Sequence, residues 1–418
     1  MTRTKRRIPS WSRVRCVVND QSLATGQRSL GDPDLRYPLW PPLTSGCPAT
    51  STDTTAYPVE VDYDYDRVPA GLFQQPPGPG LERWAPLLPP LRAPGLGEGG
   101  TPLIELPGHG VFVKDESRNP TWSHKDRLNR VAVSAAAGVG APGVVVASSG
   151  NHGASAAAYA ARAGLRCIVL ASAEMPPAVS SFLQSYGAVV LAVPTAARWP
   201  LLRRITVETG FHPVSNVTTT HTGHAFGPEG YKTIAYEIFA ELGVPAALFV
   251  PTGYGELLFG VWKGFAELVR LGLARTTPRV FACEPAAGGP LARAVAEGLP
   301  ATSVDVGPTG AYAISSAVSG YRATVAIQES AGRALLVDDA EMALAQRVLA
   351  RSGLWYELSS AAGLAGFRQV ADEFDGPVVC VATSSGFKDI GVGDHPPEVL
   401  EPDWDVVRRR LLDDGIPC

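Results

Sequence analysis

The sequence has few features of a membrane, disulfide-rich or nucleic-acid-binding protein. Its six cysteines are far apart and include no C-x-x-C pair, so neither a disulfide framework nor a zinc site is predicted. No apolar run has the length of a transmembrane segment or the form of a secretion signal. The 36 basic and 40 acidic residues leave a formal net charge of −4, which gives no reason to expect nucleic acid or an anionic membrane as partner. We therefore expect a cytoplasmic globular protein with a small-molecule partner.

Several common catalytic motifs are also missing. No Gly-Lys-Ser/Thr triplet closes the glycine-containing turn at 252–260, and the spacing G-x-G-x-x-G is not met there, so nucleotide binding is not favoured. No G-x-S-x-G elbow occurs, which argues against a serine hydrolase. His124 and His152 have no carboxylate or cysteine at ligand spacing, so we expect them to shape a site or to form hydrogen bonds, with no metal bound.

Short apolar strands alternate with helical segments along most of the chain. Residues 143–148 have the pattern of a buried strand, and a helical segment follows at 154–163. The unit then repeats. Further strands are predicted at 110–116, 166–172, 188–193, 247–251, 279–285 and 377–386. Repeated βαβ units predict an α/β fold in which helices cover a mostly parallel sheet.

Residues 1–95 differ in composition from the rest of the chain. They are rich in proline, glycine and short polar residues, and residues 57–66 show their clearest strand pattern. The basic start, residues 1–7, is interpreted as a disordered tail. We expect the region to form an extended arm that is not part of a core.

The candidate nucleophile is Lys125, which lies in the polar stretch Lys114–Arg127. A lysine beside an acid and an arginine, followed about one βα unit later by a turn of small residues, fits an amine held against a bound electrophile or phosphate. The alternative is a solvated surface lysine, which is the more frequent role for a lysine considered alone.

Three polar turns follow predicted strands. Ser148–Gly153 could cradle an anion with the first amides of the next helix, or could be a tight βα turn chosen for packing. Thr252–Gly260 is a second junction of this kind, whose amides could hold a phosphate, although the pattern alone is weak. Thr383–Gly386 ends an apolar strand, where hydroxyl groups could hydrogen-bond a ring nitrogen or cap a helix.

Taken together and in order, these segments resemble the pyridoxal-phosphate enzymes of the tryptophan synthase β type, called fold type II, and within them the threonine synthase group. The resemblance is carried by 'LGEGGTPL', 'KDESRNPTWSHKDR', 'SSGNHGASAAAYAARAG', 'EGYKTIAYEI', 'VPTGYGELLFGVWKGFAEL', 'SSAAGLAG' and 'TSSGFKD'. It covers most of the chain, from about Tyr57 to Asp389. If these motifs did not form a shared site, packing requirements would have to account for each of them independently, and for their order along the chain.

The resemblance implies two three-layer αβα domains with mostly parallel sheets, and pyridoxal 5'-phosphate in the cleft between them. Residues 96–135 and 241–418 would form the large cofactor-binding domain. Residues 136–240 would form a smaller mobile domain, whose closure excludes water. The resemblance also implies a homodimer and an amino-acid substrate.

The resemblance further assigns roles to individual residues. Lys125 would hold the cofactor aldehyde as a Schiff base and afterwards shuttle protons. Asn151 would hydrogen-bond the phenolic oxygen of the cofactor. Thr383 would face the ring nitrogen, where a hydroxyl does not keep the ring protonated and so favours elimination over transamination. The amides of Gly253, Tyr254, Gly255, Glu256 and Leu257 would bind the cofactor phosphate, and Ser148, Ser149, His152 and Ser123 would bind the substrate.

The sequence departs from the family pattern at several positions. Trp122, His124 and Leu128 stand where the lysine loop of the family usually has Gly, Phe and Gly. Gly227 stands where threonine synthases tend to carry an arginine that binds the substrate phosphate, which weakens O-phosphohomoserine as substrate. Some members carry a cysteine-rich zinc ribbon near the N-terminus, but the cysteines there are too isolated, so no metal is predicted.

Three functions remain open. The preferred one is a threonine synthase-like lyase that catalyses β- or γ-elimination, with replacement or hydration, on an activated amino acid. The second is a serine/threonine dehydratase-like eliminase or a β-replacement synthase in specialised metabolism. The third is a cofactor-binding protein without turnover. The altered Trp122 and His124 keep the third open, whereas an intact Lys125 and Asn151 argue against it.

Overall fold

The computed structural model describes residues 21–388, except 75, 77, 109, 173, 174 and 176, together with residues 400–416. The chain divides into two units, with the boundary between Lys388 and Asp389. The predicted tail at 1–7 and the last residue of the family-like motifs, Asp389, lie outside the described residues. In the described part of the chain, no helix is both long enough and apolar enough to cross a bilayer.

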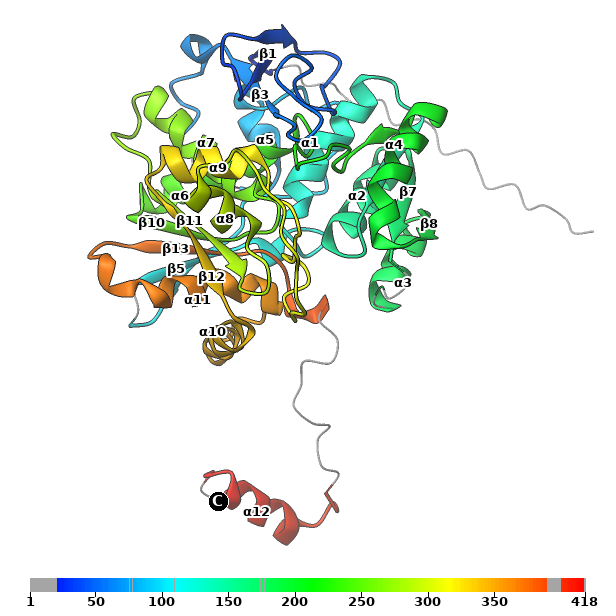
Figure 1. The fold of residues 1–418 in the computed structure, drawn as a ribbon. Helices are drawn as coiled ribbons and strands as arrows, with labels where there is room; N and C mark the ends of the chain where they lie inside the picture. The colour runs from blue at the N-terminus through cyan, green and yellow to red at the C-terminus, as the bar shows by residue number, and fades with distance from the viewer. Residues whose placement is uncertain are drawn as a thin grey trace, which may run out of the picture. The chain divides into compact units, whose positions relative to one another are not determined.

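A six-stranded sheet forms the centre of the first unit (Figure 1). Its order is β12-β11-β10-β13-β5-β4, and neighbouring strands are parallel except for β4 and β5. The strands are β4 (Leu103–Leu106), β5 (Val111–Asp115), β10 (Ala247–Pro251), β11 (Arg279–Pro285), β12 (Arg333–Val337) and β13 (Val378–Ala382). Every residue of β10 and β13 is buried, as short apolar sequences predict for central parallel strands.

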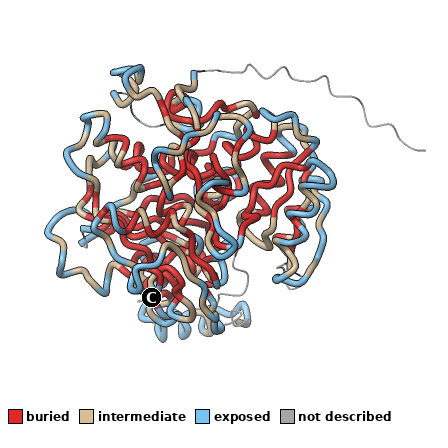
Figure 2. The backbone as a smooth tube through the Cα atoms, turned by 45° about the horizontal axis from the view of Figure 1, so that its top comes forward, coloured by how far each residue is buried: buried red, intermediate tan, exposed pale blue. Residues whose placement is uncertain are grey.

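Helices cover both faces of this sheet. Leu248 and Val250 of β10 belong to one core cluster, together with residues of α7 (Glu256–Arg270). Phe249, between them, belongs to another cluster with residues of α11 (Ala362–Gln369). Alternate strand residues therefore pack on opposite faces. Figure 2 shows that the buried backbone runs through this interior, and the arrangement has three layers.

A second, four-stranded sheet is parallel throughout and has the order β8-β7-β6-β9. Its strands are β6 (Gly143–Ala147), β7 (Arg166–Ala171), β8 (Val189–Ala192) and β9 (His212–Pro213), and its helices are α2 (Asn151–Arg162), α3 (Pro177–Ser185) and α4 (Arg198–Thr209). Val146 of β6 shares a core cluster with Ala156 of α2, whereas Val145 packs with Leu202 of α4. The two layered sheets confirm the predicted α/β fold of two αβα parts with mostly parallel strands.

Residues 21–95 contribute to the core. Strands β1 (Ala24–Ser29), β2 (Arg36–Pro38) and β3 (Val59–Tyr63) form an antiparallel sheet of order β2-β1-β3. Leu81 and Trp84 are at most 1% exposed and belong to the main core cluster. The prediction of an extended arm did not anticipate this burial, because a composition rich in proline and glycine does not show where the intervening apolar residues pack.

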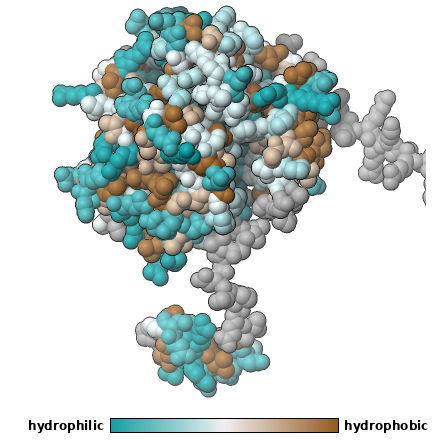
Figure 3. Space-filling model, in the orientation of Figure 1, coloured by the Kyte–Doolittle hydropathy of each residue, from teal (hydrophilic) through white to brown (hydrophobic). Residues whose placement is uncertain are grey.

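Further helices complete the two units. The first unit also contains α1 (Lys125–Gly138), α5 (Gly227–Tyr231), α6 (Thr233–Leu242), α8 (Pro290–Glu297), α9 (Tyr321–Glu329) and α10 (Asp339–Arg351). The second unit contains α12 (Trp404–Asp413), at whose start the Asp403 side chain accepts a hydrogen bond from the Asp405 amide. Its surface is largely hydrophilic, with exposed apolar side chains such as Trp404 and Leu412 (Figure 3).

A buried ionic network joins three elements behind the predicted lysine loop. Arg127 of α1 donates two hydrogen bonds to Glu116 and two to Glu237 of α6, at N–O distances from 2.6 to 2.8 Å. Lys114 of β5 pairs with Glu237 at 2.9 Å. All four side chains are at most 1% exposed. Because a buried charge is costly without its partner, the network holds α1, β5 and α6 in one relative position.

A second buried cluster connects β3 to α7. Lys263 of α7 lies 3.1 Å from Glu60 and 2.8 Å from Glu229. Lys232 pairs with Glu229 at 2.7 Å, and the Tyr63 hydroxyl donates a hydrogen bond to the same carboxylate at 2.9 Å. The N-terminal sheet is therefore joined to the main core by charged groups as well as by apolar contacts.

Replacing Glu237 with glutamine should lower the free energy of unfolding by about 3–5 kcal/mol, because Arg127 and Lys114 then remain buried with too little negative charge. The control is Glu297→Gln, which removes an exposed pair with Arg293 at 2.9 Å and should cost less than about 1 kcal/mol. Urea denaturation followed by circular dichroism measures both effects. Equal costs for the two variants would contradict the role given to the network.

The buried carboxylates also predict how stability depends on pH. Burial opposes ionisation of Glu237, but Arg127 and Lys114 outweigh it and lower the pKa from 4.5 to about 2. A carboxyl with a lowered folded-state pKa stabilises the fold fully above its unfolded pKa, and this contribution is lost as the pH falls toward the folded pKa. The free energy of unfolding should therefore fall between about pH 5 and pH 2. In the Glu237→Gln variant, the free energy of unfolding should fall less steeply with decreasing pH, as measured by urea denaturation at a series of pH values. Parallel pH profiles for the variant and the wild-type protein would argue against this role of Glu237.

Candidate active site

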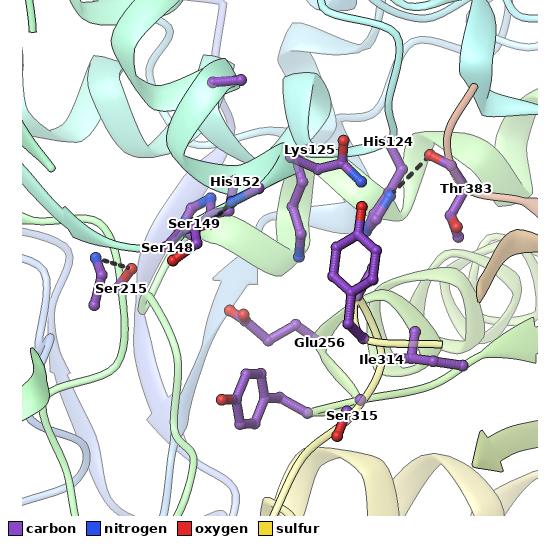
Figure 4. A pocket seen from close by; sticks show the side chains of 18 of the residues that line it. His124, Lys125, Ser148, Ser149, His152, Ser215, Glu256, Ile314, Ser315 and Thr383 are labelled. Carbon is purple, nitrogen blue, oxygen red and sulfur yellow. Dashed lines mark hydrogen bonds between the residues drawn. The ribbon is translucent and has the colours of Figure 1, made fainter. Parts of the chain in front are cut away.

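A cavity of about 530 Å³ lies in the first unit, and residues from both parallel sheets and their connections form its wall. All predicted site residues except Ser123 line it, namely Lys125, Ser148, Ser149, Asn151, His152, Gly253, Tyr254, Gly255, Glu256, Leu257 and Thr383. Figure 4 shows Lys125 projecting toward Glu256, with the Ser148–Ser149 turn on one side and Thr383 on the other. The fold thus brings together the three turns that the sequence singled out.

Lys125 is the first residue of α1, and its side chain is partly buried in the cavity. Its Nζ donates a hydrogen bond to the Tyr231 hydroxyl at 3.1 Å. Within the described residues the amine forms no ion pair with a carboxylate. Burial lowers the pKa of Lys125, and the charge of Glu256 acts in the opposite direction. A lowered pKa increases the fraction of neutral amine, which is the nucleophilic form.

The loop before Lys125 is held by backbone pairing with the strand end at Thr383. The His124 amide donates to the Thr383 carbonyl at 2.9 Å, and Ser123 forms an isolated antiparallel bridge with Ser384. Ser123 is fully buried in this bridge and does not line the cavity. The structure therefore does not bring Ser123 to the place where the resemblance would put a substrate contact.

Ser148–Gly150 connect β6 to α2, and Asn151–Gly153 begin that helix. The Gly150 amide donates to Ser148 Oγ at 3.2 Å. Ser149 Oγ accepts a hydrogen bond from the Ser172 amide at 2.6 Å and one from Arg198 Nη1 at 3.3 Å. The serine oxygens act here as acceptors, so their own protons remain available for a ligand in the cavity.

His152 supports this turn through both ring nitrogens. Nε2 lies 2.9 Å from the Val214 carbonyl oxygen, and Nδ1 lies 3.2 Å from Asn129 Nδ2. The carbonyl requires a proton on Nε2, which leaves Nδ1 as an acceptor for the Asn129 amide. Burial, with a smaller effect from the charge of Lys125, lowers the pKa of His152 to about 3. The ring is therefore neutral, and its predicted contact with substrate stays a prediction.

Asn151 contacts two charged residues that the sequence analysis did not single out. Its Nδ2 donates to both carboxylate oxygens of Glu357 at 3.2 Å, and its Oδ1 accepts from Lys388 Nζ at 2.7 Å and from Ser384 Oγ at 3.1 Å. Burial lowers the pKa of Lys388 to about 8, against the charge of Glu357. Both residues could have been identified from the sequence, because Glu357 directly precedes the family-like motif 'LSSAAGLAG' and Lys388 lies within the motif 'TSSGFKD'.

The loop Gly253–Leu257 lies where β10 turns into α7. Gly255 has a φ of +84°, and a Cβ there would lie 2.2 Å from the Ala323 side chain, so only glycine fits. Glu256 begins the helix, and its carboxylate accepts a hydrogen bond from the His224 amide at 3.2 Å. Burial raises the pKa of Glu256, against the charge of Lys125. A helix start with free amides favours an anion, and the raised pKa of Glu256 lessens the repulsion between its carboxyl and that anion.

The Thr383 hydroxyl is buried and lies 2.8 Å from Ser360 Oγ. Ser360 Oγ also accepts a hydrogen bond from the Ser384 amide at 2.9 Å. Ser360 Oγ also lies 3.2 Å from the Ser384 carbonyl oxygen, so its one proton can go to that carbonyl or to Thr383. When it goes to Thr383, the Thr383 proton is left to donate into the cavity, as an unprotonated ring nitrogen requires.

Leu128 and Gly227, two positions at which the sequence departs from the family pattern, lie next to each other in the structure. Gly227 is buried at the start of α5 and does not line the cavity, and a Cβ there would lie 3.0 Å from Leu128 Cγ. Leu128, which replaces a small residue, thus occupies the space beside the position that has lost its side chain. Trp122 replaces another glycine yet keeps a φ of +63°, a backbone conformation that favours glycine. Its ring contacts Phe182 of α3 with a centroid distance of 5.5 Å.

The pairing of Leu128 with Gly227 predicts a coupled effect on stability. Gly227→Ala alone should lower the free energy of unfolding by about 1–3 kcal/mol, because the new methyl group overpacks against Leu128. In a Leu128→Ala background the same change should cost little, since the space is then open. Chemical denaturation of the four proteins of this cycle measures the coupling. An equal cost of Gly227→Ala in both backgrounds would contradict it.

The part of the chain that forms this cavity matches a known family. The family model described as "Pyridoxal-phosphate dependent enzyme" matches residues 95–384. The threonine synthase of Methanosarcina acetivorans is 31% identical over 381 residues, which cover 85% of this chain and 92% of that protein. The threonine synthase of Methanocaldococcus jannaschii is 31% identical over 84% of this chain and 93% of its own. That of Mycobacterium tuberculosis H37Rv is 33% identical over 78% and 87%.

Solved structures share the fold. Maize serine racemase superposes with a TM-score of 0.58 at 19% identity, covering 75% of this chain and 92% of that one. Threonine deaminase isoform 2 from Solanum lycopersicum gives a TM-score of 0.59 at 20% identity, covering 68% and 79%. At such low identity these likenesses establish the fold alone.

Proposed function

The chain belongs to the pyridoxal-phosphate dependent enzymes, and on that premise we propose that Lys125 is the residue that holds the cofactor. The protein is a lyase of the threonine synthase group, which acts on an amino acid by elimination with replacement or hydration. One observation carries the assignment of Lys125. It is an amine with a lowered pKa, directed into the cavity, with no ion-pair partner in the described part of the chain.

The residues around Lys125 fit the three chemical groups of pyridoxal phosphate. The helix start at Gly253–Leu257 offers amides to a phosphate, and the glycine at position 255 keeps that loop close to α9. Thr383 offers a hydroxyl to the ring nitrogen. Asn151 offers an amide group to the phenolic oxygen, once it exchanges its contact with Glu357 or Lys388. The raised pKa of Glu256 lessens the repulsion between its carboxyl and a phosphate at this helix start.

The bound cofactor supplies an electron-withdrawing ring, and the residues of the chain move protons and exclude water. Lys125 Nζ is the group proposed to remove and return the α-proton. Tyr231, which accepts a hydrogen bond from that Nζ, holds the amine in place when it is free. The backbone amides of the Ser148–Gly153 segment and the Ser148 hydroxyl are proposed to bind the α-carboxylate of the substrate. Movement of a smaller domain, residues 136–240, would close the cavity over the substrate.

A second candidate function keeps the same site but changes the leaving group. Gly227 places no cation at the position where the family pattern has a phosphate-binding arginine, and it lies outside the cavity wall. This favours a substrate without a phosphate, as in a dehydratase-like eliminase or a β-replacement synthase. A cofactor-binding protein without turnover is less favoured, because the amine, the amide and the hydroxyl needed for chemistry all line the cavity. The homodimer and the cytoplasmic location stay predictions.

Two lysines line the cavity, and they give a matched test of the cofactor attachment. Borohydride reduction of the protein loaded with cofactor should fix it to Lys125, as detected by mass spectrometry of the peptides. Lys125→Ala should lose this label and reduce turnover by at least about 100-fold. Lys388→Ala should keep the label on Lys125, because Lys388 is held by Asn151 at 2.7 Å. Labelling of Lys388 in the wild-type protein would contradict the proposal.

A further inference from the structure

Arg198 lines the same cavity as Lys125. It is the first residue of α4, which packs on the four-stranded sheet. Its hydrogen bond to the neutral Ser149 Oγ is long, at 3.3 Å. Among the residues that the structure describes, no carboxylate pairs with it. A guanidinium has five N–H donors, so most of the donors of Arg198 are available to a ligand.

Ser149 adds a second donor at the same place. Its Oγ accepts hydrogen bonds from the Ser172 amide at 2.6 Å and from Arg198. With both lone pairs occupied, the hydroxyl proton has to point elsewhere. Ser149 also lines the cavity. An anion that contacts Arg198 can therefore accept a hydrogen bond from Ser149 as well.

Aromatic rings enclose this part of the cavity. Trp199, next to Arg198, lies 5.8 Å from the Tyr254 ring and 6.2 Å from the His221 ring, measured between centroids. Tyr254 and His221 stack at 4.2 Å with an interplanar angle of 8°. Burial, with nearby cations, holds the pKa of His221 well below its usual range, so the ring is neutral. These rings therefore add apolar surface beside Arg198, and the neutral His221 adds no second positive charge.

The charge balance favours one kind of anion. Arg198 supplies a single positive charge to this part of the cavity. A phosphate dianion bound there would carry a second negative charge that Arg198 does not balance. A carboxylate carries one charge, is planar, and matches the forked donors of an arginine in a bidentate contact.

From these contacts we propose that Arg198 and Ser149 bind a carboxylate on the side chain of the amino-acid substrate. The inference rests on the proposed function, since it assigns a second anion site in the cavity of Lys125. It names the substrate class as amino acids whose side chain ends in a carboxylate, such as an O-acyl amino acid with a terminal carboxyl group. The cation comes from α4, whereas the family pattern places its arginine at the position of Gly227.

Equilibrium titration of the holoenzyme with three amino acids tests the proposal, using the absorbance of the bound cofactor to report binding. The probes are O-succinyl-L-homoserine, O-acetyl-L-homoserine and O-phospho-L-homoserine, which share the α-carboxylate and differ in the side-chain charge. The succinyl probe should bind at least about 10-fold more tightly than the acetyl probe, because it adds a charge-assisted contact. It should also bind more tightly than the phosphorylated probe.

Variants of two arginines on the same helix separate this contact from other effects. Arg198→Gln should lower the affinity for the succinyl probe by at least about 10-fold and the affinity for the acetyl probe by less than about 2-fold. Arg198→Lys should restore only part of the affinity, because lysine cannot make the bidentate contact. Arg204→Gln is the control, since Arg204 is 77% exposed and does not line the cavity. It should change neither affinity.

Several results would overturn the proposal. If Arg198→Gln lowered the affinity for all three probes equally, Arg198 would bind the α-carboxylate that the probes share. Tightest binding of the phosphorylated probe would mean that the site takes a phosphate. Calorimetric titration with succinate alone reports on the site even if no probe changes the cofactor spectrum. Succinate binding that Arg198→Gln abolishes would then support the carboxylate site while the proposed function fails, and absent succinate binding would refute the site.

Discussion

Arg127 is buried between two carboxylates, and this network determines where the nearby Lys125 points. The two residues are two positions apart on α1 and so project roughly 200° apart around the helix axis. With Arg127 held by Glu116 and Glu237 on one side, Lys125 has to face the other side, where the cavity lies. Lys114 completes the charge balance from β5. The position of the candidate amine therefore follows from an electrostatic requirement inside the core.

The two parallel sheets contribute different chemistry to the cavity. The connections of the six-stranded sheet supply the groups that suit a cofactor, namely Lys125, the loop Gly253–Leu257 and Thr383. The part of the chain around the four-stranded sheet supplies Ser148, Ser149 and Arg198, which are proposed to bind the substrate, together with Asn151, which is proposed to contact the cofactor. Most of the groups proposed for the cofactor thus lie on one sheet, and most of those proposed for the substrate lie on the other.

The departures from the family pattern are consistent with a change on the substrate side. Leu128 fills the space beside Gly227, so the position of the usual arginine is closed by packing. Arg198 brings a guanidinium to the cavity from another direction. Trp122 keeps the backbone conformation of a glycine while its ring reaches Phe182 of α3. The residues proposed to hold the cofactor match the family pattern, whereas the residues proposed to select the substrate side chain differ from it.

The sequence by itself determined the elements that depend on local pattern. Apolar runs predicted β10 and β13, and the small-residue turns after strands marked Ser148–Gly153 and Gly253–Leu257 as candidate anion sites. That these turns form one site with Lys125 was implied by the resemblance to the family. The tertiary structure alone decided the contacts between distant segments. Asn151 contacts Glu357 and Lys388, more than 200 residues away, and Ser123 turns into a backbone bridge instead of the cavity. Such contacts depend on how sheets and loops pack together, and no period of a local sequence encodes that.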